Sequence, residues 1–188
     1  MTHKGEAYPA SGAVFLDNPI RRWLQPPSEL VEMLEIAATD AVVDFGCGHG
    51  FYTAELAKRA REVVAVDISP AMLQKARNKA TKAGVRNARF LQSDGKRIPM
   101  ADSTVDKVLL VTVYHEVADS ETVLKEFRRI LKPNGQLIIA EVVRKGIFTA
   151  APVQSPEKLK EEIKASGFKL QKRLPYRSYG VLFFAKDL

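Results

Sequence analysis

Residues 41–50, AVVDFGCGHG, decide the fold of this chain of 188 residues. An apolar run ends in Asp44, glycines follow at positions 46, 48 and 50, and the helical sequence FYTAELAKRA occupies 51–60. A short run of apolar, β-branched residues predicts a buried parallel strand. Glycines directly behind it let the chain turn sharply and let a ligand approach bare backbone, and the next helix directs its positive dipole end at the same loop. The stretch therefore predicts a small-molecule site at the carboxyl edge of a doubly wound sheet.

The spacing of the glycines indicates which ligand this loop binds. The dinucleotide fingerprint is G-x-G-x-x-G, whereas this loop reads G-x-G-x-G and has Phe51 where the third glycine would stand. Asp44, two residues before the first glycine, does not suit a pyrophosphate but suits a ligand with a positive charge near the loop. S-adenosylmethionine carries an ammonium and a sulfonium at its methionyl end. The pattern favours this cofactor over a nicotinamide dinucleotide.

Two further acidic residues follow predicted strands. EVVAVD, residues 62–67, ends in Asp67, and an acid at the tip of the second strand can accept hydrogen bonds from both ribose hydroxyls in either cofactor class. ARFLQ, residues 88–92, leads toward Asp94 and Gly95. A short polar side chain beside a glycine at this place suits the exocyclic amine of an adenine.

Four motifs in order then resemble those of a known family. VVDFGCGHG (42–50), VVAVDIS (63–69), FLQSDGKRIPMADSTVDKVLL (90–110) and ILKPNGQLIIAE (130–141) are similar to the successive motifs of class I S-adenosylmethionine-dependent methyltransferases. The nearest group is the small-molecule type that includes the ubiquinone/menaquinone methyltransferases. The resemblance implies an α/β, Rossmann-like doubly wound fold with a mostly parallel seven-stranded sheet, an antiparallel C-terminal hairpin strand and helices on both faces.

The end of the chain agrees with that fold. Residues 132–135, KPNG, are predicted to form a turn before a fifth strand at 136–141. Two predicted strands, 168–174 and 179–185, are separated by residues 175–178 only. So short a link cannot form a parallel crossover, so the pair must be an antiparallel hairpin.

The predicted contacts with the cofactor, and with its product S-adenosyl-L-homocysteine, are Asp44, Gly46, Cys47, Gly48, Tyr52, Asp67, Ile68, Met72, Asp94, Gly95 and Thr112. By the resemblance, Asp44 and the glycine loop hold the methionine part, Asp67 holds the ribose, Ile68 lies against the adenine, Asp94 with Gly95 reads its edge, and Thr112 lines the cofactor floor. Tyr52 would close over the methionine tail. Cys47 is either a packing residue of the loop or a thiol nucleophile beside the cofactor, and Met72 is either a core residue or a cofactor contact.

The candidates for catalysis follow the fourth strand, 105–111. The cofactor brings its own activated methyl, and orientation alone contributes ~7–11 kcal/mol, so methyl transfer by in-line displacement needs no acid–base set. His115 would accept a proton from a hydroxyl, phenol or amine, since an unperturbed histidine has a pKa of about 6.5. Alternatively, His115 and Glu116 bond each other and only shape the pocket. Tyr114 is a second catalytic candidate or packs on the cofactor. No cluster of metal ligands appears in the sequence, so no metal is expected.

The N-terminal region divides into a disordered tail, 1–13, and a helical cap, 14–38, before the methyltransferase domain, 39–188. By the resemblance, the cap lies over the cofactor and contributes to a substrate pocket. Alternatively, the cap has only a structural role, as a helix that packs on one face of the sheet. The residues concerned are Phe15, Leu16, Arg21 and Arg22, and Ser28 is predicted to cap the second helix of this region.

The net charge of the chain is +7, and its single cysteine excludes an internal disulfide. Without an apolar signal core or a run of ~20 apolar residues, we expect a soluble cytoplasmic domain. The basic residues are densest in a group that is either a solvated face or a polyanion surface: Lys75, Arg77, Lys79, Lys82, Arg86 and Arg89.

The leading prediction for the function is a methyltransferase acting on a small organic acceptor. The alternatives are a methyltransferase of RNA or protein that uses the basic surface, a nucleotide-dependent oxidoreductase, which the loop spacing opposes, and a protein that binds the cofactor without catalysis. The sequence therefore predicts a small-molecule partner and contains no motif that supports nucleic acid.

Overall fold

The strand, glycine loop and helix expected over residues 41–60 are present in the structure, a computed structural model that describes residues 26–144 and 152–187. The chain divides after Asp94 into two compact units, called here the N-terminal unit (26–94) and the C-terminal unit (95–144 and 152–187). The predicted tail and most of the cap, with Phe15, Leu16, Arg21 and Arg22, lie outside the described residues.

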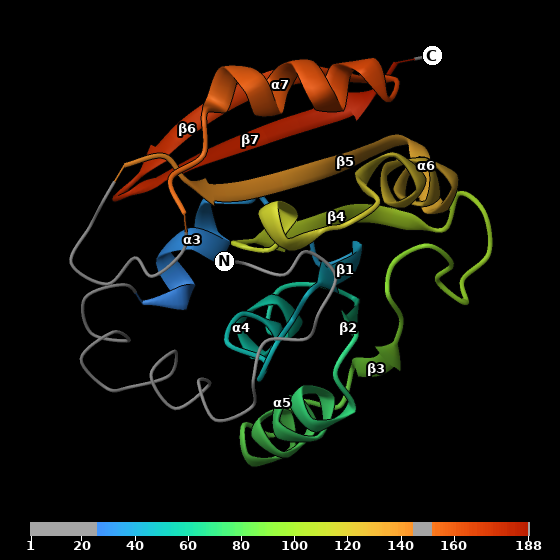
Figure 1. Cartoon of the computed structure of the whole chain (residues 1–188). Coiled ribbons are helices and arrows are strands. Elements are labelled where there is room, and N and C mark those ends of the chain that lie inside the picture. Colours follow the sequence, from blue (N-terminus) through green and yellow to red (C-terminus); the bar gives the residue numbers. More distant parts are fainter. Residues whose placement is uncertain (1–25, 145–151, 188) are drawn as a thin grey trace. The chain divides into compact units, whose positions relative to one another are not determined.

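The N-terminal unit consists of three parallel strands in the order β3-β2-β1 and three helices (Figure 1). Both α4 and α5 contact the sheet and each other, and α3 packs on α4. The elements are α3 Pro27–Met33, β1 Ala41–Phe45, α4 Thr53–Ala57, β2 Glu62–Asp67, α5 Pro70–Lys82 and β3 Ala88–Gln92. All five residues of β1 are buried, as expected for a parallel strand that is covered on both faces.

The helix starts in this unit follow local sequence signals. Ser69 caps α5 by accepting a hydrogen bond from the Met72 amide, and Pro70 occupies the first helical position. The helix ends before Gly84, whose φ of 71° is left-handed. The prediction that Ser28 caps α3 is wrong. The helix begins one residue earlier at Pro27, and its N-cap residue Pro26 makes no side-chain cap, because the fixed φ of proline suits the first turn.

The C-terminal unit has four strands in the order β4-β5-β7-β6. Strands β4 and β5 are parallel, and β7 is antiparallel to both β5 and β6. The elements are β4 Val105–Val111, the 3-10 turn η1 Tyr114–Glu116, α6 Ser120–Ile130, β5 Leu131–Val142, α7 Pro156–Ala165, β6 Phe168–Tyr176 and β7 Tyr179–Lys186. The antiparallel hairpin is confirmed, and its turn contains Arg177 with a φ of 55°.

The fold class is therefore as predicted: an α/β protein with seven strands, mostly parallel, that ends in an antiparallel hairpin. One boundary differs, since residues 132–135, expected as a turn, belong to the start of β5. No described helix has both the length and the apolar character needed to cross a membrane.

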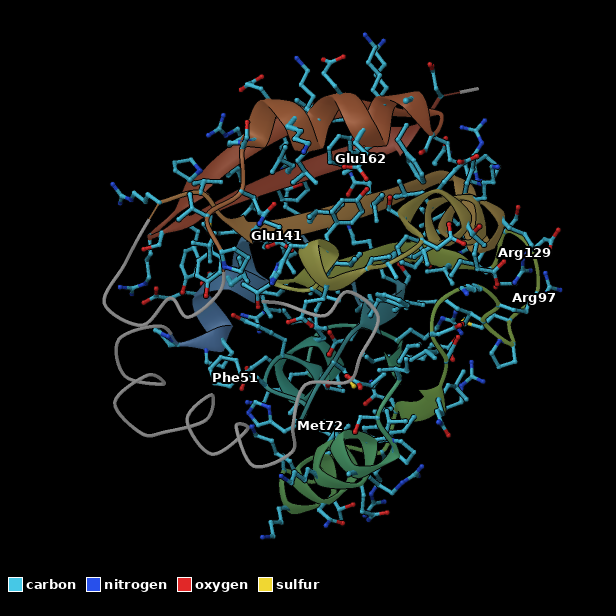
Figure 2. All side chains as sticks on the ribbon, viewed as in Figure 1. Phe51, Met72, Arg97, Arg129, Glu141 and Glu162 are labelled. Carbon is cyan, nitrogen blue, oxygen red and sulfur yellow. The ribbon has the colours of Figure 1, made fainter. Side chains whose placement is uncertain are left out.

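The loop that precedes β4 is held by one arginine of α6. Arg129 donates hydrogen bonds to the carboxylate of Glu126, at 2.6 and 2.8 Å, and to the carbonyl oxygens of Ile98 and Met100. Glu126 also accepts a hydrogen bond from the Ile98 amide, at 2.7 Å, and lies 3.8 Å from the guanidinium of Arg97. Figure 2 shows Arg129 on this side of the unit, near Arg97. These bonds fix loop residues 98–100 without regular secondary structure.

Candidate functional site

Three glycines in left-handed conformation shape the loop behind β1. Gly46, Gly48 and Gly50 have φ values of 68°, 54° and 77°, which side chains other than glycine rarely adopt. The amides of Gly46 and Cys47 both donate to the Val66 carbonyl, at 2.8 and 3.0 Å. The loop is thus fixed against the end of β2, where Asp67 lies.

Asp67 holds the loop by its side chain. Its carboxylate accepts hydrogen bonds from the Gly48 amide and the Ser69 amide, both at 2.8 Å. Burial raises the pKa of Asp67, whereas these backbone bonds act in the opposite direction. Because each carboxylate oxygen has two acceptor positions, acceptor capacity is left for a further pair of hydroxyl donors.

Asp44 is the second acid of the loop and is only 3% exposed. Its carboxylate accepts a 2.6 Å hydrogen bond from the Thr53 hydroxyl at the start of α4. Burial, with a smaller contribution from the charge of Asp67, raises the pKa of Asp44 to about 6, while the hydrogen bond from Thr53 acts in the opposite direction. The described structure gives neither acid an ion pair. One buried and one half-buried carboxylate, neither with an ion pair in the described part of the unit, are suited to a cationic ligand.

Thr53 was missed by the sequence reasoning. The sequence feature that could have identified Thr53 is a hydroxyl residue in the first turn of the helix behind the glycine loop, nine positions after Asp44.

Gly50 has a packing role that explains the unusual glycine spacing. A Cβ at this position would lie 3.0 Å from both Cα and Cβ of Ala76, so α5 approaches the loop backbone directly. In the dinucleotide fingerprint the third glycine serves close packing one position later. Here that later position is Phe51, which is buried, and Tyr52 packs edge-on against its ring at 5.0 Å.

Of the other predicted cofactor contacts in this unit, Cys47 and Met72 are buried, whereas Ile68 and Asp94 are exposed. Cys47 packs with Ala65, Leu73 and Ala76, and burial, then the nearby acids Asp44 and Asp67, raise the pKa of its thiol. Met72 is buried and lies on α5, where Figure 2 labels it. Both side chains are therefore packed in the interior of this unit. Ile68 is 40% exposed, and Asp94 is exposed behind β3.

In the C-terminal unit, the chain turns sharply at the end of β4. Thr112 has a φ of 54°, although a β-branched residue strongly disfavours this conformation. Its amide donates to the Ala140 carbonyl at 2.8 Å. The strained residue directs the chain into η1, which carries Tyr114 and His115. Backbone strain of this kind is concentrated at functional sites.

Glu141, at the end of β5, holds this turn with both carboxylate oxygens. Oε1 accepts a hydrogen bond from the Tyr114 amide at 2.8 Å, and Oε2 lies 2.9 Å from Nδ1 of His115. Glu141 is fully buried, and the His115 side chain is 6% exposed. The expected partner, Glu116, is farther away, with its Oε1 at 3.8 Å from Nε2. A carboxylate at Nδ1 fixes the proton there and leaves Nε2 as the basic nitrogen.

The sequence analysis did not single out Glu141, although this residue ends the predicted fifth strand, 136–141. The parallel register pairs Val111 with Ala140, so the next residue of β5 must stand beside the turn after β4. An acid at the end of a strand that neighbours a histidine-bearing turn was the available signal.

Tyr114 is buried and directed toward α7. Its hydroxyl donates to Glu162 at 2.9 Å, and Ser120 donates to the same oxygen at 2.7 Å. Burial and the neighbouring Glu162 raise the pKa of Tyr114, which keeps its phenol protonated. This contact connects the turn that carries His115 with α7, on which Figure 2 labels Glu162.

Each unit thus brings part of the predicted site together. The N-terminal unit joins Asp44, the glycine loop and Asp67, while Gly95, Thr112, Tyr114 and His115 belong to the C-terminal unit. Across the described ranges, no group of three or more His, Cys, Asp or Glu side chains is arranged to hold a metal ion.

Comparison with known proteins gives one family match and several relatives. A family model described as "Methyltransferase domain" matches residues 43–139. A demethylmenaquinone methyltransferase of Tropheryma whipplei (strain Twist) is 33% identical over 119 residues, 63% of this chain and 48% of the relative. A ubiquinone/menaquinone biosynthesis C-methyltransferase of Idiomarina loihiensis is 35% identical over 104 residues, 53% of this chain and 41% of the relative. The chain therefore spans less than half the length of these curated relatives.

A solved structure covers nearly the whole chain. The crystal structure of a SAM dependent methyltransferase from Aquifex aeolicus has a TM-score of 0.86 at 25% identity and covers 97% of this chain and 100% of that one.

Proposed function

The chain belongs to the methyltransferase domain family, within the class I S-adenosylmethionine-dependent methyltransferases, and we propose that it methylates a small organic acceptor with an ionisable hydroxyl. The acceptor class we propose is a phenol or hydroquinone. Support comes from the relatives named for demethylmenaquinone and ubiquinone/menaquinone methylation, and above all from the buried contact between His115 and Glu141.

The residues of the N-terminal unit fit the cofactor. S-adenosylmethionine supplies an activated methyl on a sulfonium, and its methionine part adds an ammonium. Asp44 and the backbone of Gly46 to Gly48 would hold that cationic part, because Asp44 is a buried acid without an ion pair. Asp67 would accept the ribose hydroxyls while keeping its bonds to the loop.

His115 would remove the proton of the acceptor. With Nδ1 directed at Glu141, Nε2 is the nitrogen that can accept the hydroxyl proton, and the Glu141 carboxylate stabilises the resulting imidazolium. Deprotonation makes a phenol or hydroquinone a stronger nucleophile at oxygen or at ring carbon. Orientation of this nucleophile supplies the remaining acceleration.

Two measurements test the proposal. Titration calorimetry should show binding of S-adenosylmethionine and S-adenosyl-L-homocysteine and none of NADH. Incubation with labelled cofactor and a short-chain naphthohydroquinone should give a methylated product, and His115→Ala should reduce turnover at unchanged cofactor affinity. Transfer only to RNA or protein fractions, or binding of NADH at the same site, would contradict the proposal.

The single cysteine, Cys47, is a buried free thiol. This reduced residue supports the further proposal that the protein works in the cytoplasm.

A further inference from the structure

The positive charge of the chain is concentrated in one stretch. Residues 68–93 contain six Lys and Arg and no Asp or Glu, whereas the whole chain has a net charge of +7. The remaining residues together therefore contribute only +1. This stretch, called here the basic segment, comprises α5, the following turn and β3.

Three lysines of the basic segment form a line along α5. Lys75, Lys79 and Lys82 are spaced four and three residues apart, which places them on one side of a helix over roughly 10 Å. The buried residues of the helix, Met72, Leu73, Ala76 and Ala80, form a face beside this line. Lys75 and Lys82 are exposed and Lys79 is half-buried. Arg86 and Arg89, also exposed, extend the positive surface beyond the helix, although Arg89 lies 3.5 Å from Glu62.

The aromatic rings beside the basic segment are covered by its cations. Nζ of Lys79 lies 5.4 Å from the centre of the Phe51 ring, and the Arg77 guanidinium lies 5.0 Å from the centre of the Phe90 ring. Surfaces that bind single-stranded nucleic acid combine positive charge with open aromatic rings on which bases stack. Here the rings instead hold the cations in place. The segment therefore combines positive charge with no open aromatic platform for bases.

We propose that the basic segment docks on an anionic membrane surface, with its lysines among the phosphates of lipid headgroups. A cluster of four or more Lys and Arg on a helix is the usual sequence feature of such peripheral binding. The biological purpose of this interaction rests on the proposed function, because an enzyme docked on the bilayer surface can reach a lipid-soluble hydroquinone. The binding itself follows from the charge distribution alone.

The test is sedimentation of the full chain with vesicles of phosphatidylglycerol and phosphatidylcholine, in the absence of acceptor. Wild-type protein should bind these vesicles, should not bind pure phosphatidylcholine, and should dissociate as salt is raised. Each lysine at an anionic surface contributes roughly a fivefold increase in affinity, so K75Q/K79Q/K82Q should lower the vesicle affinity about 100-fold. The matched control is K158Q/K160Q/K164Q in α7, which loses the same charge and should change the affinity by less than about fivefold.

Several outcomes would overturn the proposal. These are an absence of wild-type binding to anionic vesicles, equal losses in the two triple variants, and tighter α5-dependent binding of RNA than of vesicles. Thermal unfolding and binding of S-adenosyl-L-homocysteine verify that each variant is folded. If the α5 variant does not fold, K75Q/K82Q leaves Lys79 over Phe51 and should still reduce affinity at least about tenfold. Because vesicle binding is measured without methyl transfer, its failure is distinct from a failure of the proposed function.

Discussion

The hydroxyl of Thr53 lies 2.6 Å from the carboxylate of Asp44, and both side chains are buried behind the glycine loop. Burial raises the pKa of Asp44 to about 6 from 3.8, and the hydrogen bond from Thr53 opposes that change. The carboxyl is therefore half-protonated near pH 6 in the unliganded protein. A cationic cofactor favours the charged form, so the pair sets the pH range in which the loop binds its ligand.

Affinity for S-adenosylmethionine should consequently rise with pH through about 6. Below this point, binding must deprotonate Asp44, and affinity should fall by up to about tenfold per pH unit. Asp44→Asn should weaken binding at neutral pH and remove this dependence, and Thr53→Val should move the midpoint to higher pH. Calorimetry between about pH 5 and 8 measures all three, and a flat wild-type profile would contradict the assignment.

In the unliganded protein, the contribution of Asp44 to the free energy of unfolding falls as pH rises, which is opposite to the expected change in cofactor affinity. Because its folded pKa lies above the unfolded value, its contribution is fully present below pH 3.8 and is lost as pH rises through about 6. Asp44→Asn should therefore gain stability relative to wild type as pH increases over this range, as denaturant unfolding at several pH values would show. A constant difference between the two proteins would be evidence against the raised pKa.

Asp67→Ala should reduce cofactor affinity by tenfold or more. The substitution removes the proposed ribose acceptor and the bonds that hold the amides of Gly48 and Ser69, and charge-assisted hydrogen bonds contribute about 1.5–3 kcal/mol. Asp119→Ala is a matched control, since Asp119 caps α6 by accepting from the Thr122 amide. The control should lose about 1 kcal/mol of stability and keep its cofactor affinity. Equal affinities in both variants would mean that the ribose lies elsewhere.

Glu141→Gln should lower kcat by about tenfold to a hundredfold while leaving cofactor affinity unchanged. The amide can still accept the bond from the Tyr114 backbone, but it cannot stabilise a charged His115. The pH profile of kcat should also shift, which a purely structural residue would not cause. Glu162→Gln provides the comparison, because its amide oxygen can keep the bond from the Tyr114 hydroxyl. If the two variants behave alike, the Glu141 carboxylate has no special role.

Gly50→Ala should reduce the free energy of unfolding by about 2–4 kcal/mol, through left-handed strain and contact with Ala76. Gly84→Ala measures the cost of the left-handed conformation alone. Gly84 has a similar φ of 71°, but a Cβ there would meet nothing within 4 Å, so only about 1–2 kcal/mol should be lost. Equal losses in chemical denaturation would show that α5 can withdraw from the loop.

Much of the fold could be predicted because local signals and global pattern agree. The apolar runs that form β1 and β2 are followed by Gly46 and by Ser69-Pro70, and each signal marks an element boundary that the structure shows. The helix start at Pro27 was misplaced because Ser28 and a proline compete as start signals. Strand β5 begins early because Leu131 pairs with Val105, and the register then shifts so that the turn-like residues 132–135 lie between this pair and the next, Lys107 with Gln136.

The site was less accessible to sequence reasoning than the fold. Glycines and strand-end acids have positions fixed by the chain itself, so Asp44 and Asp67 could be named directly. The partners that determine their chemistry cannot be found in this way: Thr53 depends on how α4 packs, and Glu141 on the register between β4 and β5. Tyr114 was considered as a catalytic or cofactor contact, yet its hydroxyl is directed at Glu162, 48 residues away. Such long-range contacts are set by tertiary packing and not by local pattern.

The position of β7 between β5 and β6 has a consequence for how a growing chain folds. Ribosomes deliver β5 and β6 before Tyr179–Lys186, the strand that pairs with both. Until that strand emerges, the backbone groups of Gln136–Val142 on the β7 side of β5 have no partner from this strand, and an open edge of this kind can pair with another nascent chain. Completion of this sheet is therefore a late event in biosynthesis, and any truncation before Tyr179 leaves an aggregation-prone edge.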